Sequence, residues 1–276
     1  MNYRHIYHAG NFADVIKHIT IIALMERLKL KEAGFFILDA FAGLGIYDLK
    51  SSLALKTNEA DLGINKLYNA KVKEPILQTY LDIVKKFNKD DILRFYPGSP
   101  FIVSALQRAQ DRLIANELHE EDNQTLKENV PQVRRKFKVL NLDAYQAIKA
   151  NIPPKEKRGL IIIDPAFEDK DEFNIVYQNL VEMYKKWPTG VFMIWFPIKD
   201  NLPVKEFYQN IKDAKFNKVL LIECSLPKAN ISEGLNSCGV MIVNTPWLLK
   251  ETLINITKEL KTQTNYEFKI KDTMFV

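Results

Sequence analysis

Hydrophobic positions along the chain fall into short continuous runs separated by amphipathic stretches. Continuous rather than alternating runs of strand length are typical of strands buried on both faces of a sheet; they cover residues 35–39, 113–117, 137–141, 159–164, 190–196, 218–224 and 239–244. Apolar residues at helical spacing predict helices over 13–32, 99–110, 124–130, 173–187 and 204–212. Strands alternating with helices indicate an α/β protein with a mostly parallel, doubly wound sheet.

The connection between the last two predicted strands has no clear helix. Residues 225–238 therefore predict a direct return, with the seventh strand antiparallel beside the sixth. A seven-stranded, mostly parallel sheet whose last strand is antiparallel is typical of the Rossmann-like fold of class I S-adenosylmethionine-dependent methyltransferases. We expect that fold.

One connection is too long for a single crossover helix. About 65 residues separate Gly45 from the second predicted strand, and helical patterns recur between them. The sequence predicts a small helical subdomain inserted at about 47–93 in one methyltransferase domain, 1–276. The crossover helix is expected to begin with Ser99 as N-cap and Pro100 at its first position.

Composition narrows the class of protein. At 276 residues and 47% hydrophobic, the chain can bury a full core. No apolar run approaches the roughly 18 residues of a membrane span, and no signal peptide is readable, so we expect a cytoplasmic protein. Cys224 and Cys238 lack the spacing of a disulfide framework or zinc site and are interpreted as small buried hydrophobes.

Charge is compatible with a polyanionic partner without proving one. The net charge is +5, and basic residues cluster around Arg4 and Lys17, at 134–138 and at 155–158. Each cluster by itself is explained equally well as solvated surface.

The sequence DAFAGLG, residues 39–45, follows the first predicted strand. Gly43 and Gly45 let the backbone approach a ligand, and Asp39 can order the loop or accept a hydrogen bond from a cationic group. A dinucleotide fingerprint would require a third glycine at Asp48, so nicotinamide binding is only a minor alternative.

Two carboxylates follow the next strands. Glu117 ends the second strand and Asp143 follows the third, so both are expected to face the crevice beyond the strand ends. Glu117 can accept both ribose hydroxyls of a nucleoside ligand. Asp143 can meet an adenine amine, while the backbone at Ala144 contacts the adenine edge.

The sequence DPAF, residues 164–167, suits methylation of an exocyclic amine. Such an amine is a poor nucleophile until its hydrogens are held, and Asp164 with the Pro165 carbonyl can accept them. Phe167 can stack on the base. Taken alone, Asp-Pro is better explained as a turn between strand and loop.

The N-terminal segment 3–18 is dense in aromatic, histidine and cationic residues. His8, Asp14 and His18 complete no known metal motif, so no metal is expected. Aromatic and basic side chains together favour stacking on unpaired bases and contact with phosphate.

These motifs together resemble one family, the bacterial 23S ribosomal RNA adenine(2030)-N6 methyltransferases of the large-subunit methyltransferase J type. The resemblance spans nearly the whole chain and includes YRHIYHAGNFADVIKH at 3–18, DAFAGLG, YPGSP at 96–100, ELH at 117–119, DAY at 143–145, RGLIIIDPAFE at 158–168 and VNTPW at 243–247.

The resemblance implies S-adenosylmethionine as cofactor, 23S ribosomal RNA as partner and Asp164 as the catalytic residue. It also implies cofactor contacts at His18, Phe41, Ser99, Glu117, Asp143, Ala144 and Asp164, and contact of Tyr3 with the RNA substrate, with Lys17 as a plausible extra contact. The chemistry of the motif at 164–167 adds Pro165 and Phe167 as substrate contacts.

Three positions, in two motifs, depart from the family pattern. Phe41 stands where the family usually has His, so contact there must be apolar or through the backbone. Ala166 and Phe167 stand where the family has Pro and Tyr, which loses a stiffening ring and a hydroxyl but keeps the Pro165 carbonyl.

The sequence thus predicts a monomeric, metal-free enzyme that flips an adenine of free or partly assembled ribosomal RNA into its site and methylates N6. Two alternatives stay open. The motif at 164–167 does not distinguish RNA from DNA, so a DNA adenine or other amino-methyltransferase is one. The other is a non-catalytic RNA-binding protein that has kept the fold.

Overall fold

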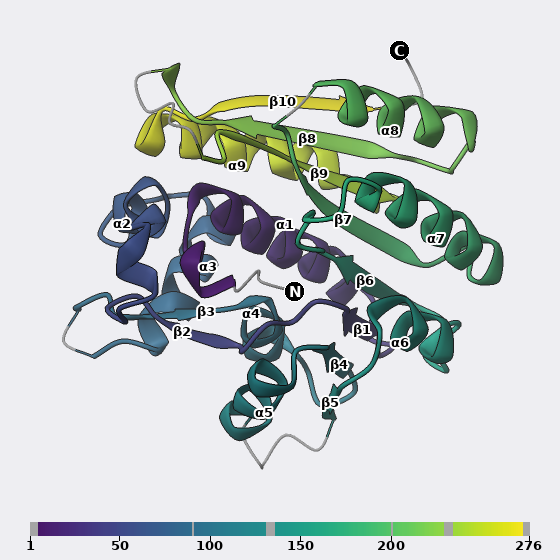
Figure 1. Cartoon of the computed structure of the whole chain (residues 1–276), viewed down its shortest axis with the longest axis horizontal. Helices are drawn as coiled ribbons and strands as arrows, with labels where there is room; N and C mark the ends of the chain where they lie inside the picture. Colours follow the sequence, from purple (N-terminus) through teal and green to yellow (C-terminus); the bar gives the residue numbers. More distant parts are fainter. Residues whose placement is uncertain (1–4, 90, 131–135, 200, 229–233, 273–276) are drawn as a thin grey trace.

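The computed structural model describes residues 5–89, 91–130, 136–199, 201–228 and 234–272. Its main sheet has eight strands in the order β10-β8-β9-β7-β6-β1-β4-β5 (Figure 1). The strands are β1 (Phe36–Asp39), β4 (Arg112–Asn116), β5 (Phe137–Leu140), β6 (Gly159–Ile163), β7 (Val191–Pro197), β8 (Leu220–Ser225), β9 (Ser237–Val243) and β10 (Glu267–Asp272).

The seven predicted strands are all present and in a methyltransferase arrangement. β5, β4, β1, β6 and β7 run parallel, and β9 lies antiparallel between β7 and β8. The predicted antiparallel seventh strand beside the sixth is confirmed. The eighth strand, β10, pairs antiparallel with β8 at the sheet edge and was not predicted.

Helices cover both faces of the sheet because the strand residues are apolar on both sides. In β1, Ile37 belongs to one core and Phe36 and Leu38 to the other. The first core is covered by α1 (Phe12–Lys29), α4 (Ser99–Leu106), α5 (Glu120–Asn129) and α9 (Leu249–Thr264). The second is covered by α6 (Ala144–Asn151), α7 (Glu172–Lys186) and α8 (Asn201–Asp213).

The segment between β1 and α4 leaves the main sheet. It contains two short strands that pair with each other, β2 (Ile46–Asp48) and β3 (Phe95–Pro97). Between them lie the 3-10 turns η2 (Ala54–Lys56) and η3 (Glu59–Leu62) and the helices α2 (Ile64–Leu67) and α3 (Pro75–Lys86). Figure 1 shows α2 and α3 beside the start of α1, and buried α3 residues such as Tyr80 and Leu81 share the core of α1.

Two features differ from the sequence expectation at element ends. Gly98, not Ser99, is the N-cap of α4, so Ser99 and Pro100 are its first two residues. Helix α9 and strand β10 were not predicted. Strand β10, with the sequence EFKIKD, alternates charged and apolar residues at an exposed edge of the sheet, so it lacks the continuous apolar run of the other strands. None of the helices in the described ranges is long and apolar enough to cross a membrane.

Candidate functional site

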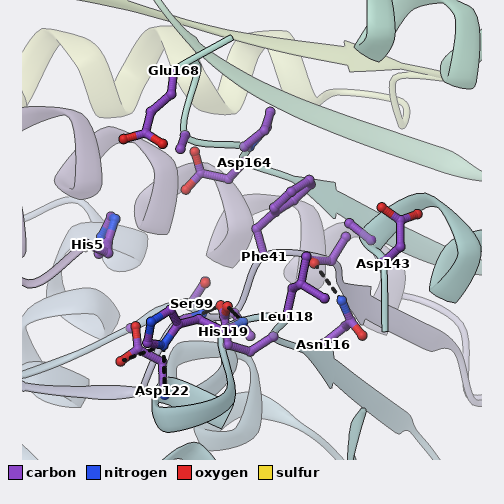
Figure 2. A pocket seen from close by; sticks show the side chains of 18 of the residues that line it. His5, Phe41, Ser99, Asn116, Leu118, His119, Asp122, Asp143, Asp164 and Glu168 are labelled. Carbon is purple, nitrogen blue, oxygen red and sulfur yellow. Dashed lines mark hydrogen bonds and ion pairs between the residues drawn. The ribbon is translucent and has the colours of Figure 1, made fainter. Parts of the chain in front are cut away.

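A cavity of about 410 Å³ lies at the carboxyl ends of the parallel strands. This size suits a small ligand. Of the residues predicted from sequence to form the site, the cavity is lined by Phe41, Ser99, Glu117, Asp143, Ala144, Asp164 and Pro165. In Figure 2, Asp164 and Glu168 lie on one side, Ser99, His119 and Asp122 on the other, and Phe41 between them. Parallel strands end at one edge, so residues distant in sequence meet there.

Glu117 accepts a hydrogen bond from the loop after β1 and so fixes this loop in the cavity wall. One Glu117 carboxylate oxygen accepts the Gly43 N–H at 2.8 Å, and the other accepts the His119 N–H at 2.8 Å. Gly43 has φ +60, and an added Cβ would lie 2.2 Å from the Tyr47 hydroxyl, so glycine is required there. Burial raises the pKa of Glu117, while the two N–H donors favour its charged form.

Asp143 and Asn116 fix the neighbouring loop. The Asp143 carboxylate accepts the Gln146 N–H at 2.9 Å and so caps α6, which begins with Ala144. The Asn116 amide donates to the Ala40 and Leu142 carbonyls at 3.1 and 3.0 Å, tying two cavity loops together. Asn116 lines the cavity and was not predicted, although its place at the end of a predicted strand was a usable signal.

Lys17 joins the N-terminal helix to the end of β6. Its ammonium donates to Asp164 at 2.5 Å and lies 2.7 Å from Asp14. Asp14 also accepts the Gly10 N–H at 2.9 Å and lies 3.1 Å from His5 Nε2. Burial disfavours both charges, but the ion pairs dominate: they hold the pKa of Asp14 well below its usual range and raise that of Lys17. Lys17 is 4% exposed and still reaches the cavity.

The structure does not bring His18 to the cavity. Its Nδ1 lies 2.8 Å from the Tyr96 hydroxyl, which in turn lies 3.0 Å from the Tyr80 hydroxyl of α3. Burial lowers the pKa of His18 to about 3, so the ring is neutral at physiological pH. His18 therefore links the helical insertion to α1, one layer behind the cavity wall.

Phe167 is also placed away from the cavity. Its backbone has φ +51, which aromatic residues rarely adopt, and this turns the ring toward Phe173 and Trp195, with centroids 4.7 and 6.2 Å away. Glu168 and Ala166, on either side of it, line the cavity instead. Tyr3 lies outside the described residues.

A second cavity of about 60 Å³ adjoins the first across the ion pair. Lys17 and Asp164 line both cavities, and Trp195 and Pro197 of β7 line only the second. Asp164 therefore stands between two spaces of unequal size.

Cys224 and Cys238 face each other across β8 and β9 as free, buried thiols, as predicted. In the described ranges, no three His, Cys, Asp or Glu side chains gather as a metal site would require.

Asp39, the last residue of β1, is fully buried behind the cavity loop. Burial raises its pKa to about 6, against smaller lowering effects of the Ser99 hydroxyl and Lys17. A buried carboxyl with a raised folded-state pKa does not destabilise the fold below its unfolded pKa. The destabilisation grows as the pH rises from the unfolded pKa to the folded pKa and is complete above the folded pKa.

Asp39→Asn is therefore expected to gain stability over the parent protein as the pH rises from 4 to above 6. The gain should approach about 3 kcal/mol at pH 8 and be roughly half of that at pH 5, because one pKa unit corresponds to about 1.4 kcal/mol. Urea unfolding of both proteins at the two pH values measures it. If the difference in stability between the two proteins did not change with pH, burial would not raise the pKa of Asp39 in the folded protein.

Comparison with known proteins places the chain in a family. Residues 32–269 match the family model described as ribosomal RNA large subunit methyltransferase D, RlmJ. The ribosomal RNA large subunit methyltransferase J of Haemophilus influenzae is 37% identical over 265 residues, covering 94% of each chain. Its Escherichia coli counterpart is 36% identical over 256 residues, covering 93% of this chain and 91% of its own.

Solved structures agree with the sequence comparison. A Legionella pneumophila protein is 33% identical and superposes with a TM-score of 0.87 over 96% of this chain and 98% of its own. A probable spermidine synthase of Corynebacterium glutamicum, 11% identical with a TM-score of 0.54, shares the fold alone. The resemblance inferred from the motifs is confirmed, and the chain belongs to the family of ribosomal RNA large subunit methyltransferases described as RlmJ.

Proposed function

We propose that this protein transfers a methyl group from S-adenosylmethionine to N6 of one adenine in 23S ribosomal RNA. The observation that carries the proposal is the position of Asp164 and Pro165, which follow β6 and lie in the wall of the cavity that Glu117 and Asp143 also line. A cofactor site and an amine-holding turn thus share one edge of the sheet, in a chain whose relatives are named ribosomal RNA methyltransferases.

The cavity fits the cofactor in size and in the chemistry of its lining. Its carboxylates stand on different walls, with Glu117 suited to ribose hydroxyls and Asp143 and the Ala144 backbone suited to an adenine ring. Phe41 presents an aromatic face, 6.1 Å from the Tyr145 ring. When bound, S-adenosylmethionine supplies a sulfonium-linked methyl group that a nitrogen nucleophile can displace.

Asp164 and the Pro165 carbonyl are proposed to accept the two hydrogens of the adenine amine. This turns the nitrogen lone pair out of conjugation with the ring and stabilises the charge that develops on nitrogen. Lys17 orients the Asp164 carboxylate from the side of the smaller cavity. That cavity, bordered by Trp195 and Pro197, is where we place the approach of the target base.

The structure changes how two proposed contacts must work. His18 can support the cofactor only indirectly, since it is turned to Tyr96. Phe167 can stack on the base only if the 164–167 turn rearranges, because its ring now packs on Phe173. The contact proposed for Tyr3 rests on the family resemblance.

We further propose that the chain works in the cytoplasm as one methyltransferase domain with the helical insertion at about 47–93. All groups invoked come from a single copy, so a monomer suffices. Because flipping a base costs less in unpaired regions, free or partly assembled ribosomal RNA is the proposed substrate.

Labelled methyl transfer tests the function directly. The protein is incubated with S-adenosylmethionine and either 23S RNA transcript or adenine-containing duplex DNA, and products are mapped by mass spectrometry. We expect N6-methyladenine at one position of the RNA and none in the DNA. Transfer only to DNA would support the alternative of a DNA methyltransferase, and cofactor binding without any transfer would support a non-catalytic RNA-binding protein.

Glu117→Ala is expected to weaken S-adenosylmethionine binding by about tenfold to a hundredfold, because hydrogen bonds to a charged group are worth about 1.5–3 kcal/mol. Calorimetric titration measures it. Asp122→Ala, which removes another carboxylate from the same cavity wall, is the matched control and should change affinity by only a few-fold. Unchanged affinity in a folded Glu117→Ala protein would remove Glu117 from the proposed cofactor site.

A further inference from the structure

A charged surface lies at the amino ends of the parallel strands, opposite the carboxyl ends that border the cavity. An open groove there is lined by Gly34, Gln110, Arg112, Lys136, Lys155 and Glu156. Arg112 begins β4, Lys136 precedes β5, and Lys155 lies in the loop before β6. These strands are close neighbours in the parallel part of the sheet (Figure 1), so their amino ends bring separate basic stretches of the sequence together.

Cations outnumber carboxylates strongly on this edge. The loops that surround the groove carry seven cations, namely Lys31, Arg108, Arg112, Lys136, Lys155, Lys157 and Arg158, against three carboxylates, Glu32, Asp111 and Glu156. The difference, seven minus three, is +4, close to the net charge of +5 of the whole chain. Arg134 and Arg135, which belong to the same sequence cluster, lie outside the described residues.

The arginines and the lysines of this edge do different things. Arg112 pairs with Glu156 at 2.9 Å, and Arg108 pairs with Asp111 at 3.0 Å. Arg158 donates to the carbonyl of Leu28, in the last turn of α1, at 2.7 Å and to that of Ala33, after the helix, at 2.9 Å. These guanidinium groups hold the loops together and are largely satisfied.

The lysines, in contrast, face solvent. Lys136, Lys155 and Lys157 are exposed, and none forms an ion pair with a residue in the described ranges. Exposed ammonium groups above a framework of paired arginines are suited to the phosphates of a polyanion, which they contact without reading sequence.

We infer that this surface, which we call the lysine edge (Lys136, Lys155 and Lys157), binds the phosphate backbone of ribosomal RNA at a place remote from the methylated base. The inference rests on the proposed function, which supplies RNA as the partner. Strands of about five residues alone separate the two edges by roughly 17 Å, so a short RNA seated in the cavity does not reach the lysine edge. A longer, folded RNA that wraps the domain reaches both.

The experiment compares the triple variant Lys136→Gln, Lys155→Gln, Lys157→Gln with a matched control. The control variant, Lys258→Gln, Lys261→Gln, Lys269→Gln, removes the same charge from exposed positions on α9 and β10. Affinity for a 23S RNA fragment of several helices and for a short hairpin with the target adenine is measured across a salt series. Methyl transfer to both RNAs is measured in parallel.

For the lysine-edge variant we expect affinity for the long RNA to fall on the order of tenfold. The negative slope of log affinity against log salt should become shallower by about two to three. Turnover on the short hairpin should stay within twofold of the parent protein. The control variant should bind the long RNA nearly as the parent does.

Two results would overturn the inference. One is long-RNA binding by the lysine-edge variant that equals that of the control; the other is an equal loss on the short hairpin, which would place these lysines at the catalytic site. A failure of the proposed function would be distinguishable, because the parent protein would then bind RNA but transfer no methyl group. In that case the binding measurements would still test whether the lysine edge contacts RNA.

Discussion

Asp164→Ala is expected to fold, bind S-adenosylmethionine and lose methyl transfer by on the order of 100- to 1,000-fold. Removing one preorganised group that stabilises transition-state charge typically costs this much. The fold should survive because Lys17 keeps Asp14 as its partner, 2.7 Å away, when Asp164 is gone. If Asp164 only formed part of a turn, its replacement by alanine would leave turnover nearly intact.

Single-turnover transfer of labelled methyl to unmodified 23S RNA measures this effect, with thermal melting and cofactor titration on the same preparation. Glu168→Ala is the matched control, since Glu168 lies on the same side of the cavity (Figure 2) and is expected to alter the rate only a few-fold. If Asp164→Ala turned over within a few-fold of the parent, the catalytic role would be wrong.

Lys17→Met is expected to lower the free energy of unfolding by about 3–5 kcal/mol, the usual cost of removing one partner from a buried ion pair. The reason is that Lys17 neutralises two carboxylates, and Asp14 is only 3% exposed. Methionine keeps most of the volume, so lost packing contributes little. Urea unfolding at pH 7 measures the change.

Two further variants separate charge from other effects. Lys29→Met removes a more exposed ion pair of the same helix, with Glu26, and should cost about 1 kcal/mol or less. Adding Asp14→Asn to Lys17→Met should recover part of the loss, because one unpaired carboxylate disappears. A loss below about 1 kcal/mol for Lys17→Met alone would mean that water reaches these carboxylates and that the ion pair does not organise the site.

The positions of seven strands along the chain were predictable because their signal is local. Continuous apolar runs such as Gly159–Ile163 are required where both faces of a strand are buried, and in β6 all five residues are buried. The loop motifs then followed, since Glu117 and Asp164 end predicted strands and Asp143 follows one. Strand β10 escaped this logic because only one of its faces packs, and its lysines and glutamate face outward.

The sequence by itself determined the strand-end residues and their common edge, because parallel strands present their carboxyl ends on one side. Only the tertiary structure decided which neighbours complete the site. Lys17 and Asp164 are 147 residues apart, and they meet because α1 packs inside the core, where Ile16 and Ile19 are buried beside Lys17. Successive helix residues differ by about 100° in direction, with 3.6 residues per turn, so the rotation that sends Lys17 to the cavity turns His18 toward Tyr96.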